Sequence, residues 1–157
     1  MVLFKTIGFL IFAVCLSCQS FPDFTVEEYH QYEALFSRES GWTGADGVYS
    51  VNMGDSNTLW LFGDTWMGEI KDGRHVDADL INNSVAIQHG KQPVSGAVTF
   101  HYGRKTDGTP QAFVLPQEGG GWYWPYDGIL TPRGLFLFLI PCYTLLGSLG
   151  RGFSGRE

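Results

Sequence analysis

The stretch DGVYSVNMGDSNTLWLF, residues 46–62, decides the fold, and DGILTPRGLFLF, residues 127–138, repeats its plan. Each begins with Asp-Gly, continues as a short strand, turns, and ends in a very apolar strand. A supersecondary unit that recurs along a chain is the signature of a repeat architecture. The recurrence predicts two equivalent β-hairpins, and it sets two carboxylates, Asp46 and Asp127, at equivalent places in them.

The composition favours an all-β protein. Gly occurs 21 times among 157 residues, with 5 Trp, 7 Tyr and 12 Phe, and short apolar runs between turn residues are typical of sandwiches, barrels and propellers. The formal charge of −6 comes from 10 basic and 16 acidic residues, and the basic residues form no stripe. Nucleic-acid binding is therefore disfavoured, because it needs clustered cations that neutralise phosphates.

Residues 1–18 have the pattern of an export signal and not of a folded element. Lys5 precedes an apolar run that is too short to span a bilayer, and the run CLSC at 15–18 resembles a bacterial lipoprotein box. This pattern predicts that Cys18 carries a lipid that anchors the chain to a membrane, at the outer membrane or the cell surface. The alternative is cleavage without lipidation, which gives a secreted protein.

The remaining chain divides into a short helical prelude and a run of strands. Residues 19–40 are predicted to form a tether and a short helix, and the capping box from Thr25 to Glu28 places that helix at 26–37. From residue 41 the apolar period changes to two. Strands are predicted at 46–52, 58–64, 82–89, 96–102, 111–115, 126–131 and 134–140.

This order of strands is typical of propeller blades. The first four strands are predicted to form one antiparallel meander, and a blade is a four-stranded sheet whose first strand lies nearest a central channel. Residues 41–140 would then form an incomplete β-propeller of about one and a half blades. Residues 147–157 carry no strand pattern, and residues 141–157 are interpreted as an aberrant or truncated tail. The chain is thus expected to be an N-terminal fragment, and a small domain completed by self-association is the alternative.

The register of the first hairpin brings carboxylates together. If its turn centres on Asp55, then Asp46 opposes Asp64, and cross-strand partners have Cβ atoms about 4.5–5.5 Å apart. Asp46 opens the first strand and Asp64 closes the second, so both lie at the same rim of the sheet. Asp127 is predicted to reach that rim from the neighbouring unit.

Converging acids suit the hydrolysis of glycosides. That reaction needs one carboxylic acid to protonate the leaving oxygen and one carboxylate to act as base or nucleophile. A polar side chain from residues 82–84 can reach the same rim and bind a hydroxyl. The alternative is structural, because Asp-Gly often marks turns and Asp64 can bond loop backbone. Four tryptophans are candidates for stacking on sugar faces: Trp42, Trp66, Trp122 and Trp124.

Three motifs, GWTGADGVYSV at 41–51, LWLFGDTW at 59–66 and WYWPYDGIL at 122–130, together resemble the start of a bacterial family of secreted propellers. That family is catalogued as a domain of unknown function and is related to five-bladed arabinanase and levansucrase-like glycoside hydrolases. The resemblance implies a five-bladed propeller and, for some relatives, hydrolysis of arabinose-containing polysaccharide. It further implies that Asp46 is the general base, that Asp127 is an auxiliary acid, and that the general acid lies in a later blade.

Signals for metals and cofactors are weak. The acidic loop that contains Asp72, Asp77 and Asp79 lacks the ligand order of an EF-hand, so a solvated loop is favoured over a calcium site. No cofactor is predicted. The histidines show no metal-ligand spacing and are expected at the surface or in loops: His30, His75, His89 and His101.

The function predicted from the sequence is an exported, carbohydrate-active propeller of glycoside-hydrolase type. Its expected partners are a polysaccharide or oligosaccharide and, through the lipid anchor, a membrane. Because the general acid is expected in a later blade, the chain given is expected to be an inactive fragment. The alternatives are a glycan-binding propeller without catalysis and a gene remnant without function.

Overall fold

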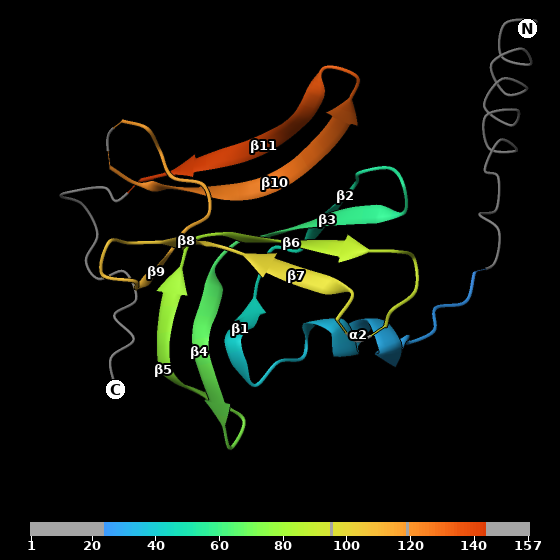
Figure 1. The fold of residues 1–157 in the computed structure, drawn as a ribbon, viewed down its shortest axis with the longest axis horizontal. Coiled ribbons are helices and arrows are strands. Elements are labelled where there is room, and N and C mark those ends of the chain that lie inside the picture. Colours follow the sequence, from blue (N-terminus) through green and yellow to red (C-terminus); the bar gives the residue numbers. More distant parts are fainter. Residues whose placement is uncertain (1–23, 95, 119, 144–157) are drawn as a thin grey trace, which may run out of the picture.

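The computed structural model describes residues 24–94, 96–118 and 120–143. Within these ranges the chain is all-β apart from one short helix, and its strands form several antiparallel sheets (Figure 1). The predicted export signal, including Cys18, lies outside the described residues. The elements are α2 (His30–Phe36), β1 (Ser40–Ala45), β2 (Tyr49–Asn52), β3 (Asn57–Phe62), β4 (Thr65–Lys71), β5 (Arg74–Ile81), β6 (Ser84–His89), β7 (Val98–His101), β8 (Gly103–Arg104), β9 (Pro110–Gln111), β10 (Trp122–Thr131) and β11 (Gly134–Cys142).

The central sheet has four antiparallel strands in the order β2-β3-β6-β7. This confirms the predicted meander. Val51 pairs with Leu59, as a turn centred on Asp55 requires. Asp55 and Ser56 both have positive φ angles, 47° and 62°, which two-residue hairpin turns need to match the twist of the strands.

A second sheet, in the order β1-β4-β5, was not predicted from the sequence. Two of its strands, β4 and β5, lie between β3 and β6 in the sequence and are joined by the turn at Asp72 and Gly73, whereas β1 precedes β2. The sequence analysis assigned that turn to a loop and its flanks to no strand. Buried and exposed residues alternate through the first three positions of β4, and Thr65 and Met67 are buried, so the strand pattern is present but short.

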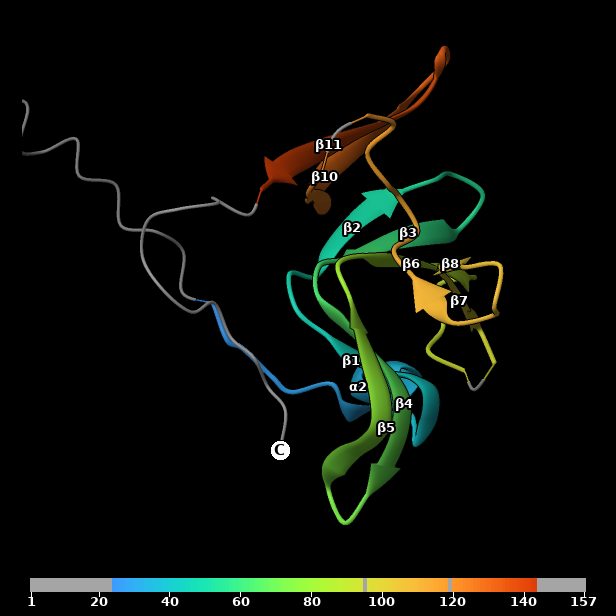
Figure 2. The same ribbon diagram turned by 90° about the vertical axis from the view of Figure 1, so that its left-hand side faces the viewer.

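The hairpin β10–β11 covers the opposite face of the central sheet from α2 and the second sheet (Figure 2). Leu137 packs among Val51, Leu59 and Leu61. Gly128 allows this approach, because a Cβ atom there would lie 2.8 Å from Val51 Cγ2. β11 runs to Cys142, so the first two residues of the predicted tail belong to a strand, and the described chain continues to residue 143.

The core between the central sheet and α2 is aromatic. Phe36 from the helix packs edge-on against Trp60 and Phe62, with ring centroids 5.2 and 6.0 Å apart. The helix begins at His30 and not near residue 26, and no side chain caps its N-terminus. Phe24 and Val26 are 81% and 85% exposed, so they add little of the packing on which a short helix depends.

Among the described residues, the short helix α2 falls well below the length and apolarity that a membrane-spanning helix requires.

Candidate functional site

Asp46 and Asp64 lie side by side at one end of the hairpin β2–β3. The amide of Asp46 donates to the carbonyl of Asp64 at 3.0 Å, and the amide of Gly63 donates to the carbonyl of Asp46 at 2.9 Å. These bonds continue the β2–β3 pairing beyond the regular strands. The predicted pairing of the two acids is therefore confirmed, and we call this end of the hairpin the rim.

The absence of a side chain at Gly63 leaves room for the Asp46 carboxylate. Oδ1 of Asp46 occupies the space in which a Cβ atom of residue 63 would stand. Gly63 is itself buried, and any larger side chain would force the carboxylate to rotate away. Asp64 thus supplies one acid of the pair. Gly63 positions the other, Asp46, because it has no side chain in the space that the Asp46 carboxylate occupies.

A cavity of about 500 Å³ opens beside the two carboxylates. Trp66 lines it from β4 and His75 from β5, and their rings stack with centroids 4.9 Å apart and planes 17° from parallel. Nδ1 of His75 lies 3.1 Å from the hydroxyl of Thr43. The complete lining, which we call the rim cavity, is Gly44, Ala45, Asp46, Asp64, Trp66, His75 and Leu80.

The sequence analysis missed His75 as a functional candidate. It expected all four histidines at the surface or in loops, and His75 is indeed exposed. Its place in the cavity depends on the hairpin β4–β5, which was not predicted. Residue spacing carries no signal for it; only the Asp-Gly turn at 72–73, interpreted as a hairpin turn, would have pointed to it.

The end of the hairpin β10–β11 reaches the rim through Trp124. Its indole nitrogen donates to Oδ1 of Asp64 at 2.9 Å, and the amide of Asn82 donates to the same oxygen at 3.5 Å. Asn82 thus reaches the rim, as predicted for residues 82–84, and its bond to a hydroxyl of a ligand stays a prediction. Burial, and then the negative charge of Asp64, raise the pKa of the Cys142 thiol, which disfavours the thiolate form.

The other two predicted tryptophans have different positions. Trp122 is half-buried behind Trp124, with ring centroids 6.1 Å apart, and its buried Nε1 has no hydrogen-bond partner among the described residues. Trp42 is 4% exposed, and its ring stacks on Phe100 at 4.4 Å. The prediction that Trp42 stacks on sugar is therefore wrong, because both the ring and its neighbours belong to the core.

Asp127 does not join the rim cavity. Asp46 precedes β2, whereas Asp127 lies within the ten-residue strand β10. Its neighbour Tyr126 packs on Tyr49 with ring centroids 5.5 Å apart, further along β2 than Asp46. The two Asp-Gly units are thus not equivalent, and the predicted convergence of three acids is reduced to two.

Buried hydroxyls hold the backbone that carries Asp64. Trp42 Nε1 donates to Ser84 Oγ at 3.0 Å, and Ser84 Oγ lies 2.9 Å from Thr65 Oγ1. Thr65 Oγ1 in turn donates to the carbonyl of Gly63 at 2.8 Å. Thr65 and Ser84 are fully buried, so this chain of bonds fixes residues 63–65 from the core side and leaves the Asp64 side chain facing the rim.

Within the described residues, no group of three or more His, Cys, Asp or Glu side chains gathers in a way that could hold a metal ion. Asp72 lies in the β4–β5 turn, and Asp77 and Asp79 lie in β5. The structure therefore places these three acids along a hairpin and not around a common centre.

Residues 29–147 match the family described as a domain of unknown function, DUF5005. The chain belongs to the DUF5005 family. This agrees with the expected membership of a family catalogued as a domain of unknown function. No curated protein is a significant match to the chain.

A solved structure shares the fold of this DUF5005 chain. It is the crystal structure of a "putative hydrolase" from Bacteroides ovatus ATCC 8483, with a TM-score of 0.61 and 19% sequence identity over 71% of the chain. The DUF5005 chain spans 33% of the length of that protein. At this identity the likeness concerns the fold alone.

Proposed function

We propose that this chain forms part of an exported, carbohydrate-active β-propeller of glycoside-hydrolase type, and that the rim cavity binds its glycan. The observation that carries the proposal is the pairing of Asp46 and Asp64 in a cavity that also presents the Trp66 ring. Carboxylates beside an exposed aromatic face suit a sugar, because carboxylates accept hydrogen bonds from hydroxyls and ring faces pack on C–H groups.

The two carboxylates have different surroundings and so suit different roles. Asp46 is exposed, and as general base it would take a proton from the water that attacks the anomeric carbon. Asp64 accepts a hydrogen bond from Trp124, which fixes its orientation toward the bound sugar. The leaving oxygen must gain a proton from a separate acid, which lies in a later blade of the propeller enzymes that the sequence resembles. Asp127 has no role in this cavity.

Two structural features support a propeller. The four-stranded sheet with a second hairpin stacked on its face matches the way in which one blade follows another. The outer residues of that hairpin are apolar and exposed: Ile129 at 52%, Phe136 at 50% and Phe138 at 54%. Exposed apolar patches of this kind mark surfaces that another structure covers, as a further blade would. The fold likeness to a protein named a putative hydrolase supports the same proposal.

Binding of neutral oligosaccharides to the full chain is the first test. Incorporation of 5-fluorotryptophan gives each of the five tryptophans its own fluorine NMR signal, which single Trp→Phe variants assign. We expect arabino-oligosaccharides to shift the Trp66 and Trp124 signals, and Asp46→Asn to weaken that binding about tenfold, because hydrogen bonds to a charged group contribute about 1.5–3 kcal/mol.

Asp55→Asn is the matched control, because it removes the same charge at the opposite end of the same hairpin. It should leave the affinity unchanged. If no neutral oligosaccharide moves the Trp66 or Trp124 signal, the rim cavity is not a glycan site and the proposal fails.

Hydrolysis separates an enzyme from a glycan-binding propeller without catalysis. The release of reducing ends from arabinan is measured for the full chain and for Asp46→Asn. A general base usually contributes about 10²–10⁴-fold to the rate. If Asp46→Asn lowers turnover by that factor, the protein is an enzyme. Binding at the rim without turnover fits either a module that only binds or a chain that needs the acid of a later blade.

The proposal of a lipid anchor rests on residues 15–18 and has its own test. In cells grown with labelled palmitate, the chain should carry label and fractionate with membranes. Cys18→Ser should lose both properties. Unlabelled protein in the medium would instead indicate cleavage without lipidation.

A further inference from the structure

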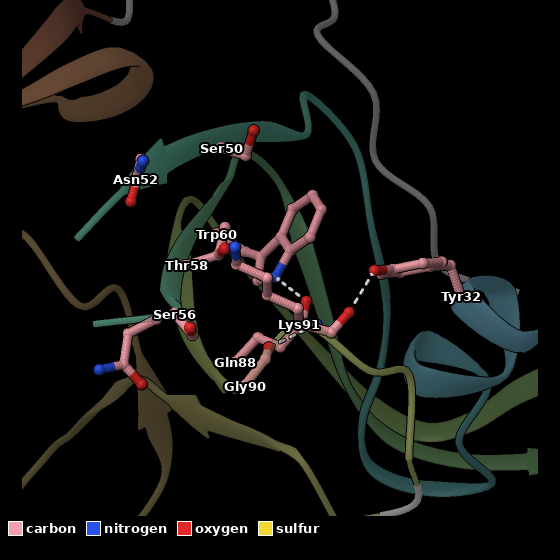
Figure 3. Close-up of a pocket in the computed structure, with 10 residues that line it drawn as sticks. Tyr32, Ser50, Asn52, Ser56, Thr58, Trp60, Gln88, Gly90 and Lys91 are labelled. Atoms are coloured by element: carbon pink, nitrogen blue, oxygen red, sulfur yellow. Dashed lines mark hydrogen bonds between the residues drawn. The ribbon is translucent and has the colours of Figure 1, made fainter. Parts of the chain in front are cut away.

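Figure 3 shows a second cavity, whose volume is about 470 Å³. Its lining includes Ser56 and Asn57 at the turn of the β2–β3 hairpin, the end opposite the rim. It shares no residue with the rim cavity. Its centre is Trp60, and we call it the Trp60 cavity. Side chains from β2, β3 and β6 surround the indole, and the α2 residue Tyr32 closes one side (Figure 3).

Strand register explains why these side chains lie together. Ser50 pairs with Trp60, and Asn52 pairs with Thr58. Thr58 pairs in turn with Gln88. Directly opposed residues on one face have neighbouring side chains, so the pairing produces a patch of hydroxyl and amide groups across three strands, with one tryptophan in it.

The cavity is held in shape by hydrogen bonds and packing. Trp60 Nε1 donates to Gln88 Oε1 at 3.1 Å, and the Tyr32 hydroxyl donates to the carbonyl of Lys91 at 2.7 Å. Phe36 packs on the Trp60 ring. Ser50 and Asn52 are exposed and Thr58 is half-buried, so their polar groups are accessible to a ligand. The site is therefore already formed in the absence of a ligand.

The chemistry of the lining selects a class of ligand. Lys91 is the one charged residue among the lining residues, and a single exposed lysine is a weak site for phosphate, since phosphate sites use several donors or a guanidinium fork. The lining holds no carboxylate that would attract a cation. An apolar ligand would leave the hydroxyl and amide groups without partners, which costs free energy.

We propose that the Trp60 cavity is a binding site for a neutral oligosaccharide, separate from the rim and without catalytic groups. Sugar hydroxyls would bond Ser50, Asn52 and Thr58, and a sugar ring would pack on the accessible face of Trp60. Its volume lies in the range of about 300–1,000 Å³ that is usual for small-molecule sites. The site does not depend on the function proposed for the rim.

The fluorine signal of Trp60 tests this site, while that of Trp66 reports on the rim. The full chain is titrated with maltotriose, cellotriose, xylotriose and arabinotriose at millimolar concentrations. We expect at least one of them to shift the Trp60 signal. The double substitution Ser50→Ala with Thr58→Ala should weaken that binding about tenfold, because each lost hydrogen bond contributes about 0.5–1.5 kcal/mol.

Two controls make the result decisive. Thr99→Ala removes a hydroxyl from the neighbouring strand β7, outside the cavity, and should leave both the Trp60 shift and the dispersion of the spectrum unchanged. Titration with inorganic phosphate is the second control, and it should leave the Trp60 signal unmoved. A Trp60 signal that no trisaccharide moves overturns the proposal, and so does binding that survives the double substitution. Inorganic phosphate that shifts the Trp60 signal and requires Lys91 would identify an anion site instead.

Discussion

Gly63 controls the geometry of the rim because its missing Cβ leaves room for the Asp46 carboxylate. Gly63→Ala should therefore move that carboxylate while the backbone keeps its conformation, because the atom displaced is the end of a rotatable side chain. We expect the affinity for oligosaccharide at the rim to fall about as far as in Asp46→Asn, roughly tenfold. The stability should change by less than about 1 kcal/mol, because the atoms nearest a Cβ at residue 63 all belong to Asp46, and the carbonyl of residue 63 can keep its bond from Thr65.

The Trp66 fluorine signal and urea denaturation measure these two quantities. Gly120→Ala is the control, because no heavy atom lies within 4 Å of a Cβ built there. A large loss of stability in Gly63→Ala with unaltered binding would mean that the glycine serves the fold and not the carboxylate.

Asp107 gives a pH-dependent prediction. The Thr109 hydroxyl, and then the Thr109 amide, donate to its carboxylate and hold the pKa of Asp107 below its ordinary value. Since the folded pKa is depressed, the contribution to stability is present above the unfolded pKa and is lost as pH falls through the folded pKa. Thr109→Val should raise the pKa of Asp107 toward its ordinary value, as followed by carboxyl NMR titration. Thr99→Val, which lies in β7 and makes no bond to Asp107, should leave it unchanged.

Sequence reasoning worked for residues whose position follows from local pairing. Asp46 and Asp64 could be paired because the turn sets the register of the strands that lead to them. Trp42 and His75 could not be placed, since each depends on the second sheet, β1-β4-β5. Asp127 was misplaced because WYWP at 122–125 extends β10 before the Asp-Gly pair, and the chain there forms a bulge between Pro125 and Asp127 in place of a turn.

At the scale of elements, Asn83 joins the central sheet to the hairpin β10–β11. Its side-chain amide donates to the carbonyls of Val114 and Tyr123 at 3.0 and 2.8 Å, and its oxygen accepts from the amide of Val114 at 2.7 Å. Asn83 is fully buried. Its side chain therefore satisfies three backbone groups of the segment that leads into β10.

Asn83→Ala should lower the free energy of unfolding by about 3 kcal/mol, because each buried polar group left without a partner costs about 1–3 kcal/mol and such costs do not add fully. Asn82→Ala is the matched control: it removes the same groups from the next residue, where the amide makes one bond at 3.5 Å. Urea denaturation followed by fluorescence measures both. Equal effects would show that Asn83 is not the link between the two parts.

The more apolar the strands of a sheet are, the more readily the sequence predicts that sheet. The strands of the central sheet alternate or run apolar over enough residues to be recognised, and the turns between them carry Gly, Asn or Asp. β1 was missed because SGWTGA at 40–45 contains two glycines, which are typical of loops. Its pairing with β4 depends on tertiary contacts of Trp42, which no local pattern contains.

For the whole molecule, stability should be greatest in the central sheet. β3 and β6 are its two inner strands and have partners on both sides, whereas β11 pairs only with β10. Amide hydrogen exchange is slow where strands are buried and paired on both sides. We expect the slowest amides in β3 and β6 and faster exchange in β11. Equally slow exchange in β11 would indicate that another surface covers its outer edge.

The hydrogen bonds of the Asn83 side chain also imply an order of folding steps during synthesis. All the strands of the central sheet are complete by residue 101, but the partners of the Asn83 side chain lie 31 and 40 residues beyond it. A nascent chain can thus close its first sheet on the ribosome while this amide is still hydrated. Its burial waits until Tyr123 has left the exit tunnel, and only then does Trp124 come within reach of Asp64. The hydrogen bond from Trp124 to the rim would thus form after the sheet that carries the rim.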